Sequence, residues 1–337
     1  ERCGGGSGGG VYYPWPRQSL VWREEDAFFE ISLDENENLL LYSLPDGTIS
    51  TGQSEMGYEF QRETKSTDYV ILKMEGETAY VSLDFVREYT NLEFSVFTEP
   101  NRVMIVNDWG ERNLATIKKH TQVRADKDVK SPVLTSVSKK DTVTIIDEDG
   151  NWNKVRTEDG VIGYVKSKKL KNIRTETISK EFEEPVYSSI SKDYTINMAW
   201  HLVTSSSANS SVLEKIANTK GLTTISPTWF VVSNTSGDMQ SFANEKYVNY
   251  TGQLGIEVWA LVKDFDGGIG SPQETFELLS RTSSRKNLIQ QLVEAVRKYN
   301  IHGINVDFEN VSEECGKHYL QFIKELSVEC RKENIRV

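Results

Sequence analysis

The pattern of apolar and polar positions divides the chain into three blocks. In residues 18–110, short apolar runs alternate with turn sequences, and residues 74–78 form a hairpin signal. A short helix is predicted at 82–86, with Ser82 as its N-cap. These signals predict a small α+β module over residues 18–112.

The second block, residues 113–172, is denser in strand signals. Tight turns rich in acidic residues and glycine separate five short apolar runs, a spacing typical of a small all-β barrel. The predicted strands are 123–125, 133–135, 141–146, 152–156 and 161–165.

The third block begins near residue 193, after a polar linker predicted at 173–192. Apolar runs now alternate with stretches of helical spacing, which indicates a parallel sheet or a (β/α)8 barrel. The predicted strands are 196–203, 223–233, 256–263 and 301–308, and the predicted helices are 212–218, 244–253, 284–299 and about 313–333.

Both ends of the chain look cut. Residues 1–17 are predicted to be a flexible tail, because a glycine-rich stretch fills most of the first ten positions. There is no initiator Met and no signal-peptide pattern, and 335–337 reads as the start of a fifth strand. Residues 193–337 are therefore expected to form the first half of a barrel. Residues 1–337 as given are expected to be inactive and, if expressed alone, poorly soluble or dependent on self-association, because open strand edges remain unpaired.

Composition narrows the classes of partner. The net charge of −11 disfavours a nucleic-acid binder, and no apolar run reaches the roughly 20 residues of a membrane-spanning helix. Residues 113–172 carry 13 basic and 8 acidic side chains, a local charge of +5 that leaves −16 on the rest. This basic module suits a polyanionic surface such as a cell wall; an ordinary solvated lysine-rich face is the other interpretation.

The strongest chemical signal is the segment 302–309, at the end of the last complete predicted strand. Side chains alternate between the two faces of a strand, so Asn305, Asp307 and Glu309 are expected to point the same way, toward the mouth of a barrel. Two neighbouring carboxylates repel, so one of them is expected to hold a proton and serve as a general acid. Glu309, nearer the mouth, is the better acid; a solvated loop pair after a buried strand is the alternative.

This segment resembles the D-x-x-D-x-D-x-E signature of glycoside hydrolase family 18. It matches at Gly303, Asp307 and Glu309 and departs at His302 and Asn305, where the signature has Asp. The G-x-N-x-D-F-E form is similar to that of the spore-cortex and cell-wall N-acetylglucosaminidase branch.

The resemblance implies substrate-assisted retaining catalysis, in which the 2-acetamido group of the sugar attacks its own anomeric carbon. Glu309 would protonate the glycosidic oxygen and later activate water, Asp307 would stabilise the charged acetamido group, and Asn305 would hydrogen-bond Asp307. No metal or other cofactor site is predicted, because the histidines lack metal-ligand spacing.

Three tryptophans lie in the first three predicted strands of this block and are candidate sugar contacts: Trp200, Trp229 and Trp259. Trp229 is expected to be the best of them, with packing between barrel and helices as the alternative for each. The glycine-rich segment 264–270 is expected to form a flexible rim of the cleft.

The other two blocks have resemblances of their own. The runs 150–155 and 160–165 are similar to the "G-x-W-x-K-V … G-x-x-G-Y-V" ending of bacterial SH3-like domains. Residues 78–89 and 100–105 resemble the small domains called copper amine oxidase N-terminal-like, a name that implies no copper here.

The sequence thus predicts an extracellular, wall-associated or spore-associated glycosidase of N-acetylglucosamine-containing polysaccharide. Peptidoglycan or spore cortex is the preferred substrate and chitin-like glycans come second, with the SH3-like module contacting the bacterial cell wall. A non-catalytic glycan-binding protein on the same barrel is the alternative, and a pure wall anchor is a third possibility.

Overall fold

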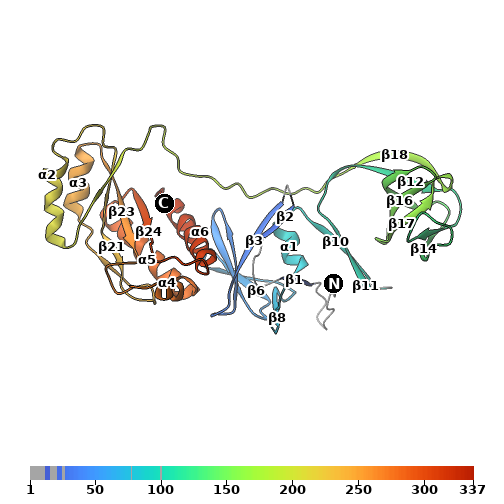
Figure 1. Cartoon of the computed structure of the whole chain (residues 1–337), viewed down its shortest axis with the longest axis horizontal. Coiled ribbons are helices and arrows are strands. Elements are labelled where there is room, and N and C mark those ends of the chain that lie inside the picture. Colours follow the sequence, from blue (N-terminus) through green and yellow to red (C-terminus); the bar gives the residue numbers. More distant parts are fainter. Residues whose placement is uncertain (1–11, 16–20, 25–26, 77, 99–100) are drawn as a thin grey trace. The chain divides into compact units, whose positions relative to one another are not determined.

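The computed structural model describes residues 12–15, 21–24, 27–76, 78–98 and 101–337, with side chains described from residue 31 onward (Figure 1). The predicted tail lies mostly outside these residues, but Tyr12–Trp15 forms strand β1, so the tail prediction is wrong for that stretch. The chain forms two compact units, one containing residues 80–184 and the other residues 30–79 with 185–337. The single module predicted at 18–112 is therefore divided near residue 80.

The unit that contains residues 80–184 includes most of β9 (Thr78–Ser82) and all of helix α1 (Leu83–Tyr89). The predicted cap is confirmed, because the Ser82 side chain accepts a hydrogen bond from the Asp84 amide. At the other end of the helix, the Lys180 ammonium donates to the carbonyls of Arg87 and Thr90, which satisfies backbone groups that the helix leaves open. Two antiparallel strands follow, β10 (Glu93–Thr98) and β11 (Asn101–Val106).

A seven-stranded antiparallel sheet makes up the rest of this unit, in the order β14-β13-β17-β16-β15-β12-β18. All five predicted strands are present. Two strands that the pattern missed extend the sheet beyond β15, namely β12 and the edge strand β18. Strand β18 continues to Ile178, so the first part of the predicted linker is strand. The strands are β12 (Gly110–Ile117), β13 (Thr121–Arg124), β14 (Val133–Val137), β15 (Thr142–Asp149), β16 (Trp152–Thr157), β17 (Ile162–Lys166) and β18 (Leu170–Ile178), with a 3-10 turn η1 (Ser167–Lys169).

In the other unit, parallel strands alternate with helices, as predicted for residues 193–337. The elements are β19 (Met198–His201), η2 (Ser206–Ser211), α2 (Val212–Ile216), β20 (Thr224–Pro227), β21 (Phe230–Val232), β22 (Met239–Ser241), α3 (Glu245–Gln253), β23 (Glu257–Lys263), α4 (Pro272–Leu279), α5 (Thr282–Tyr299), β24 (Gly303–Asp307) and α6 (Gly316–Lys332). Helix α4 was missed, although its signal is in the sequence: Ser271 caps Glu274, and Pro272 occupies the first turn.

The second predicted strand is interrupted. β20 and β21 both pair in parallel with β23, and residues 228 and 229 separate them. Thr228 explains the break, because its hydroxyl takes the place of a backbone partner and bonds both the amide and the carbonyl of Val203.

One face of the parallel strands packs against the helices and buries Ile225, Val258, Ala260, Val262 and Ile304. Helices α4, α5 and α6 gather beside β24 on this side (Figure 1). At the chain end, Arg336 forms a parallel bridge to Gly303, which is consistent with a further strand beginning there. The completed first half of a barrel stays a prediction.

Residues 30–79 contribute an antiparallel sheet to the same unit and pack against α6. Its strands, in sheet order, are β2 (Val21–Glu24), β3 (Ala27–Asp34), β4 (Leu39–Leu44), β5 (Gly47–Gly52), β6 (Gly57–Phe60) and β7 (Glu63–Ser66), and β8 (Leu72–Glu75) lies outside this sheet. Buried Asp34 accepts hydrogen bonds from the amide and hydroxyl of Thr282, and so caps α5, whose own N-cap residue Arg281 makes no side-chain cap bond.

Candidate active site

Strand β24 places Asn305 and Asp307 on one face. Its register with β23 aligns Asn305 with Leu261 and Asp307 with Lys263, while Val306 faces the helices. We call the face that bears Asn305 and Asp307 the site face. The predicted alternation therefore holds for these two side chains.

The Asn305 amide is held in place across the sheet. Its Nδ2 donates to the Oγ of Ser226, 3.1 Å away, and Ser226 is itself fully buried on β20. This bond fixes the rotamer of Asn305 next to Asp307. The predicted hydrogen bond from Asn305 to Asp307 itself stays a prediction.

Glu309 lies beyond the strand, in the loop that follows β24, and its side chain is exposed. Its position comes from Asp264, a residue that follows β23 and is 0% exposed. One Asp264 oxygen accepts the Glu309 amide at 2.8 Å, and the other accepts the Asn310 amide at 3.1 Å and the Thr275 hydroxyl at 2.7 Å. Asp264 could not be recognised from the sequence pattern, because a lone Asp after a strand carries no signal of its partners.

Gly267 and Gly268 are tightly packed, and the prediction of a flexible rim is wrong for these two residues. A Cβ on Gly268 would lie 1.6 Å from the carbonyl oxygen of Ser233, and a Cβ on Gly267 would lie 2.4 Å from the Val231 side chain. Only glycine allows this loop to approach the end of β21 so closely. The close approach supports the backbone on which Asp264 sits.

The three tryptophans occupy three different environments. Trp229 is 0% exposed, donates its indole N–H to Asn209 and packs edge-on against Tyr247 at 4.9 Å, which places it among the packing residues of the core. Trp259 is on the site face, but its ring covers Gly303, at the opposite end of β24 from Asp307. Gly303 and Asp307 are four residues apart, which is about 13 Å along a strand at 3.3 Å per residue. Trp200 is 66% exposed and pairs in register with Ser226, so it is the tryptophan whose ring is open on the site face.

Burial shifts the pKa values of two rings near the site, Tyr319 and His302. Burial raises the pKa of the Tyr319 hydroxyl, and the carboxylates of Asp264 and Asp307 add to the rise. His302, where the family signature has Asp, accepts the Val258 amide through Nδ1 at 3.2 Å, and burial lowers the pKa of its imidazole. A neutral His302 thus joins β24 to β23 as a structural residue.

Within the described ranges, no three His, Cys, Asp or Glu side chains are grouped so that they could hold a metal ion. In the same part of the chain, no helix is both long and apolar enough to cross a membrane.

Two segments match known protein families. Residues 266–336 match the family Glycosyl hydrolases family 18, and residues 119–171 match the Bacterial SH3 domain. Both resemblances predicted from the motifs are thereby confirmed. The copper amine oxidase N-terminal-like resemblance stays a prediction.

Among individual proteins, the chain is 29% identical over 108 residues to the "Uncharacterized glycosylase YvbX" of Bacillus subtilis (strain 168), covering 30% of each chain. It is also similar to two solved structures. The C-terminal domain of a putative chitinase from Desulfitobacterium hafniense DCB-2 has 19% identity and a TM-score of 0.36, covering 42% of this chain and 44% of that one. The putative sporulation-specific glycosylase ydhD from Bacillus subtilis has 20% identity and a TM-score of 0.31, covering 33% and 36%. The chain spans 30% of the length of the curated relative and less than half of each solved chain.

Proposed function

We propose that residues 193–337 carry the acid/base half of a glycoside hydrolase site that cleaves N-acetylglucosamine-containing polysaccharide. The observation that carries this proposal is the Asp264 anchor, which holds the Glu309 backbone directly after the strand that bears Asn305 and Asp307. The match of residues 266–336 to the family 18 model supports it, since that segment contains Asp307 and Glu309.

In the proposed mechanism the acetamido carbonyl oxygen of the substrate attacks the anomeric carbon as the glycosidic C–O bond breaks. Glu309 gives its proton to the departing oxygen. Water then attacks the anomeric carbon, the bond to the acetamido oxygen breaks, and Glu309 takes a proton back from that water. The exposed position of Glu309 leaves its side chain accessible to a polymer.

Asp307 stabilises the positive charge that develops on the acetamido group, and Asn305, held by Ser226, keeps a polar side chain beside it. Trp200 is the proposed sugar-stacking residue, because its ring is exposed on the site face. Trp229 and Trp259 support the site through packing.

Peptidoglycan or spore cortex is the proposed substrate and chitin-like glycan the second choice, which would place the enzyme outside the cell, at the wall or spore. The basic SH3-like module supports a wall substrate, because it gives the hydrolase a second contact with an anionic surface. The 337-residue chain alone is proposed to be inactive, because its described parallel strands form an open sheet and a closed barrel needs eight.

The test is Glu309→Gln in the complete gene product, assayed on purified peptidoglycan and on a chitobiose-type substrate. Loss of the acid should lower the rate of hydrolysis about 10²- to 10⁴-fold while glycan binding stays near wild type. Glu313→Gln, an exposed change four residues further along, is the matched control. Turnover by Glu309→Gln at the wild-type rate would show that another group is the acid.

A further inference from the structure

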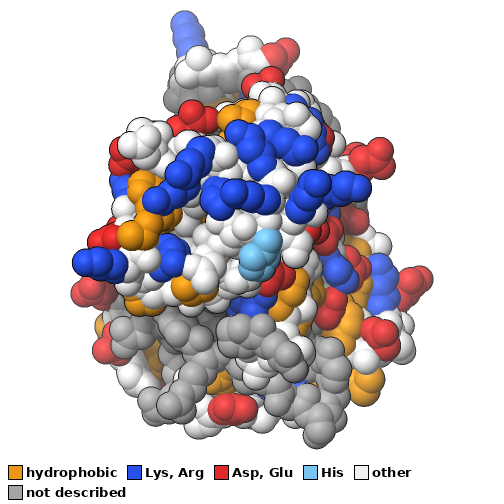
Figure 2. All heavy atoms as spheres, turned by 90° about the vertical axis from the view of Figure 1, so that its right-hand side faces the viewer, with side chains coloured by type: hydrophobic (Ala, Val, Ile, Leu, Met, Phe, Trp, Pro, Cys, Tyr) orange, Lys and Arg blue, Asp and Glu red, His pale blue; other side chains and the backbone are white. Residues whose placement is uncertain are grey.

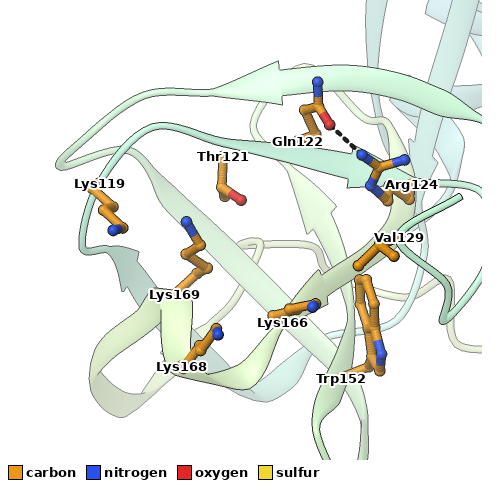
Figure 3. Close-up of a pocket in the computed structure, with 9 residues that line it drawn as sticks. All are labelled: Lys119, Thr121, Gln122, Arg124, Val129, Trp152, Lys166, Lys168 and Lys169. Carbon is orange, nitrogen blue, oxygen red and sulfur yellow. Dashed lines mark hydrogen bonds between the residues drawn. The ribbon is translucent and has the colours of Figure 1, made fainter.

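The seven-stranded module contains a cleft of about 460 Å³. Five of its nine lining residues are cations and none is acidic, although the whole chain has a net charge of −11. The lining residues are Lys119, Thr121, Gln122, Arg124, Val129, Trp152, Lys166, Lys168 and Lys169 (Figure 3).

Strand pairing and backbone hydrogen bonds hold the segments that carry these cations next to one another. Trp152 on β16 pairs directly with Lys166 on β17, and the Lys166 ammonium lies 5.4 Å from the centroid of the indole ring. The turn η1 then presents Lys168 and Lys169, and the amide of Lys118 bonds the Lys169 carbonyl at 2.8 Å, which ties η1 to the end of β12. The lysines therefore come from three segments that are fixed to one another.

The positive charge of the cleft is not neutralised from within. In the described part of the chain, no carboxylate lies within ion-pair distance of Lys119, Lys166, Lys168 or Lys169. Asp149, which pairs with Trp152 across the β15–β16 hairpin, is engaged by Lys127.

Crowding of like charges has a visible effect on one of these lysines. The pKa of Lys169 is lowered by loss of hydration and then by the neighbouring ammonium groups of Lys119, Lys168 and Lys166. Such repulsion is relieved when an anion binds among the lysines.

The side chains form a row. In Figure 3 the lysines follow one another from Lys119 through Lys169 and Lys168 to Lys166, and Trp152 with Val129 stands at the far end. Figure 2 shows blue side chains gathered across the face of the molecule formed by this module. A row of cations that ends at an aromatic ring fits a linear polymer better than a single small anion.

We propose that this cleft binds a linear glycopolymer with repeating phosphodiester groups, with the lysines on successive phosphates and Trp152 stacked on a sugar or polyol unit. Lysine is a compact point charge on a flexible stem and binds phosphate, so a series of lysines can follow successive phosphates of a polymer. Arg124 is occupied by Gln122 and by the Ser131 carbonyl, so lysines supply the free donors. This binding does not depend on the proposed hydrolytic function.

The experiment measures binding of the 337-residue chain to poly(glycerol phosphate) by calorimetry at about 0.15 M salt, where the screening length is about 8 Å. Lys168→Glu should weaken binding about tenfold or more, while Lys139→Glu, the same charge change on an exposed lysine outside the cleft, should weaken it less than about twofold. Trp152→Ala should also weaken binding, and added salt should weaken it for the wild type more steeply than for Lys168→Glu.

Equal losses for Lys168→Glu and Lys139→Glu would overturn the proposal, because the attraction would then reflect net charge alone. Absence of binding to the polymer would overturn it as well. Two comparison ligands would also overturn the proposal if they bound as tightly as poly(glycerol phosphate). One is peptidoglycan stripped of phosphate polymers, which offers carboxylates, and the other is single-stranded DNA with the same number of phosphates. Lys168 is exposed, so its substitution leaves the fold intact and the comparison stands even if Trp152→Ala unfolds.

Discussion

The buried carboxylate of Asp264 accepts the backbone amide of Glu309 at a distance of 2.8 Å. The residue proposed to move the proton is thus positioned by the side chain of the residue that directly follows β23. Two further bonds, from the Asn310 amide and the Thr275 hydroxyl, go to the same buried carboxyl group, so neither of its oxygens lacks a partner in the core.

This relationship predicts that Asp264→Asn acts on catalysis through position. The new amide keeps one acceptor oxygen, but its NH2 group replaces the other oxygen and faces a hydrogen-bond donor. Two donors repel each other, so the loop after β24 should shift. We expect kcat of the complete gene product to fall about 10- to 100-fold while KM changes less than about threefold. The neighbouring Glu313→Gln change should leave both constants near wild type. A change confined to KM would contradict the positioning role.

Substitution of Asp307 should affect acetamido substrates selectively. Asp307→Asn keeps the size of the side chain but removes the negative charge that would stabilise the cationic acetamido intermediate. The rate on N-acetylglucosaminides should fall about 10²-fold or more. Parallel rate measurements with wild type and Asp307→Asn decide the point, and equal rates on these substrates would rule out the substrate-assisted mechanism.

The glycine-rich loop offers a matched pair of substitutions. Gly268→Ala would place a methyl group 1.6 Å from the Ser233 carbonyl oxygen, whereas a methyl group at Gly270 meets no atom within 4 Å. We expect Gly268→Ala to lower the free energy of unfolding by about 1–3 kcal/mol or more, and Gly270→Ala to change it by less than about 1 kcal/mol. Thermal unfolding of the two variants, measured in parallel, checks this, and equal midpoints would mean that the loop is not packed as described.

Stability should depend on pH through His318. Burial, with help from the charges of Lys317 and Arg285, lowers the pKa of this imidazole from 6.5 to about 4, and its ring lies edge-on to Phe276 at 5.3 Å. As pH falls, the imidazole of His318 is therefore protonated near pH 6.5 in the unfolded chain but only near pH 4 in the folded chain. The free energy of unfolding should fall as pH drops through this window, by up to about 1.4 kcal/mol per pH unit from this group.

The measurement is urea unfolding between pH 7 and pH 4.5. His318→Gln should flatten the pH dependence, whereas His120→Gln, at an exposed position, should leave the slope as in wild type. A wild-type slope in His318→Gln would assign the pH dependence to other groups.

Much of the fold follows from local sequence. The strands β23 and β24 and the helices α3, α5 and α6 were predicted to within a few residues, because long runs of apolar side chains at one period leave few alternatives. The strands β13 to β17 of the SH3-like module could be predicted because tight turns rich in acidic residues and glycine mark where each strand ends. The shared face of Asn305 and Asp307 could be predicted from sequence, since residues two apart along a strand point the same way, whereas Glu309 lies beyond the strand and its position could not.

Tertiary structure alone decided which side chain positions Glu309. Asp264 and Glu309 are 45 residues apart, and only the parallel pairing of β23 with β24 brings them together. The choice among the tryptophans also depended on tertiary structure. The ring of Trp229 is buried in the core, where Asn209 and Tyr247 hold it, and Trp200 on β19 is the exposed tryptophan of the site face. Local patterns specify elements because they act between near neighbours, but burial and hydrogen-bond partners depend on contacts between segments far apart along the chain.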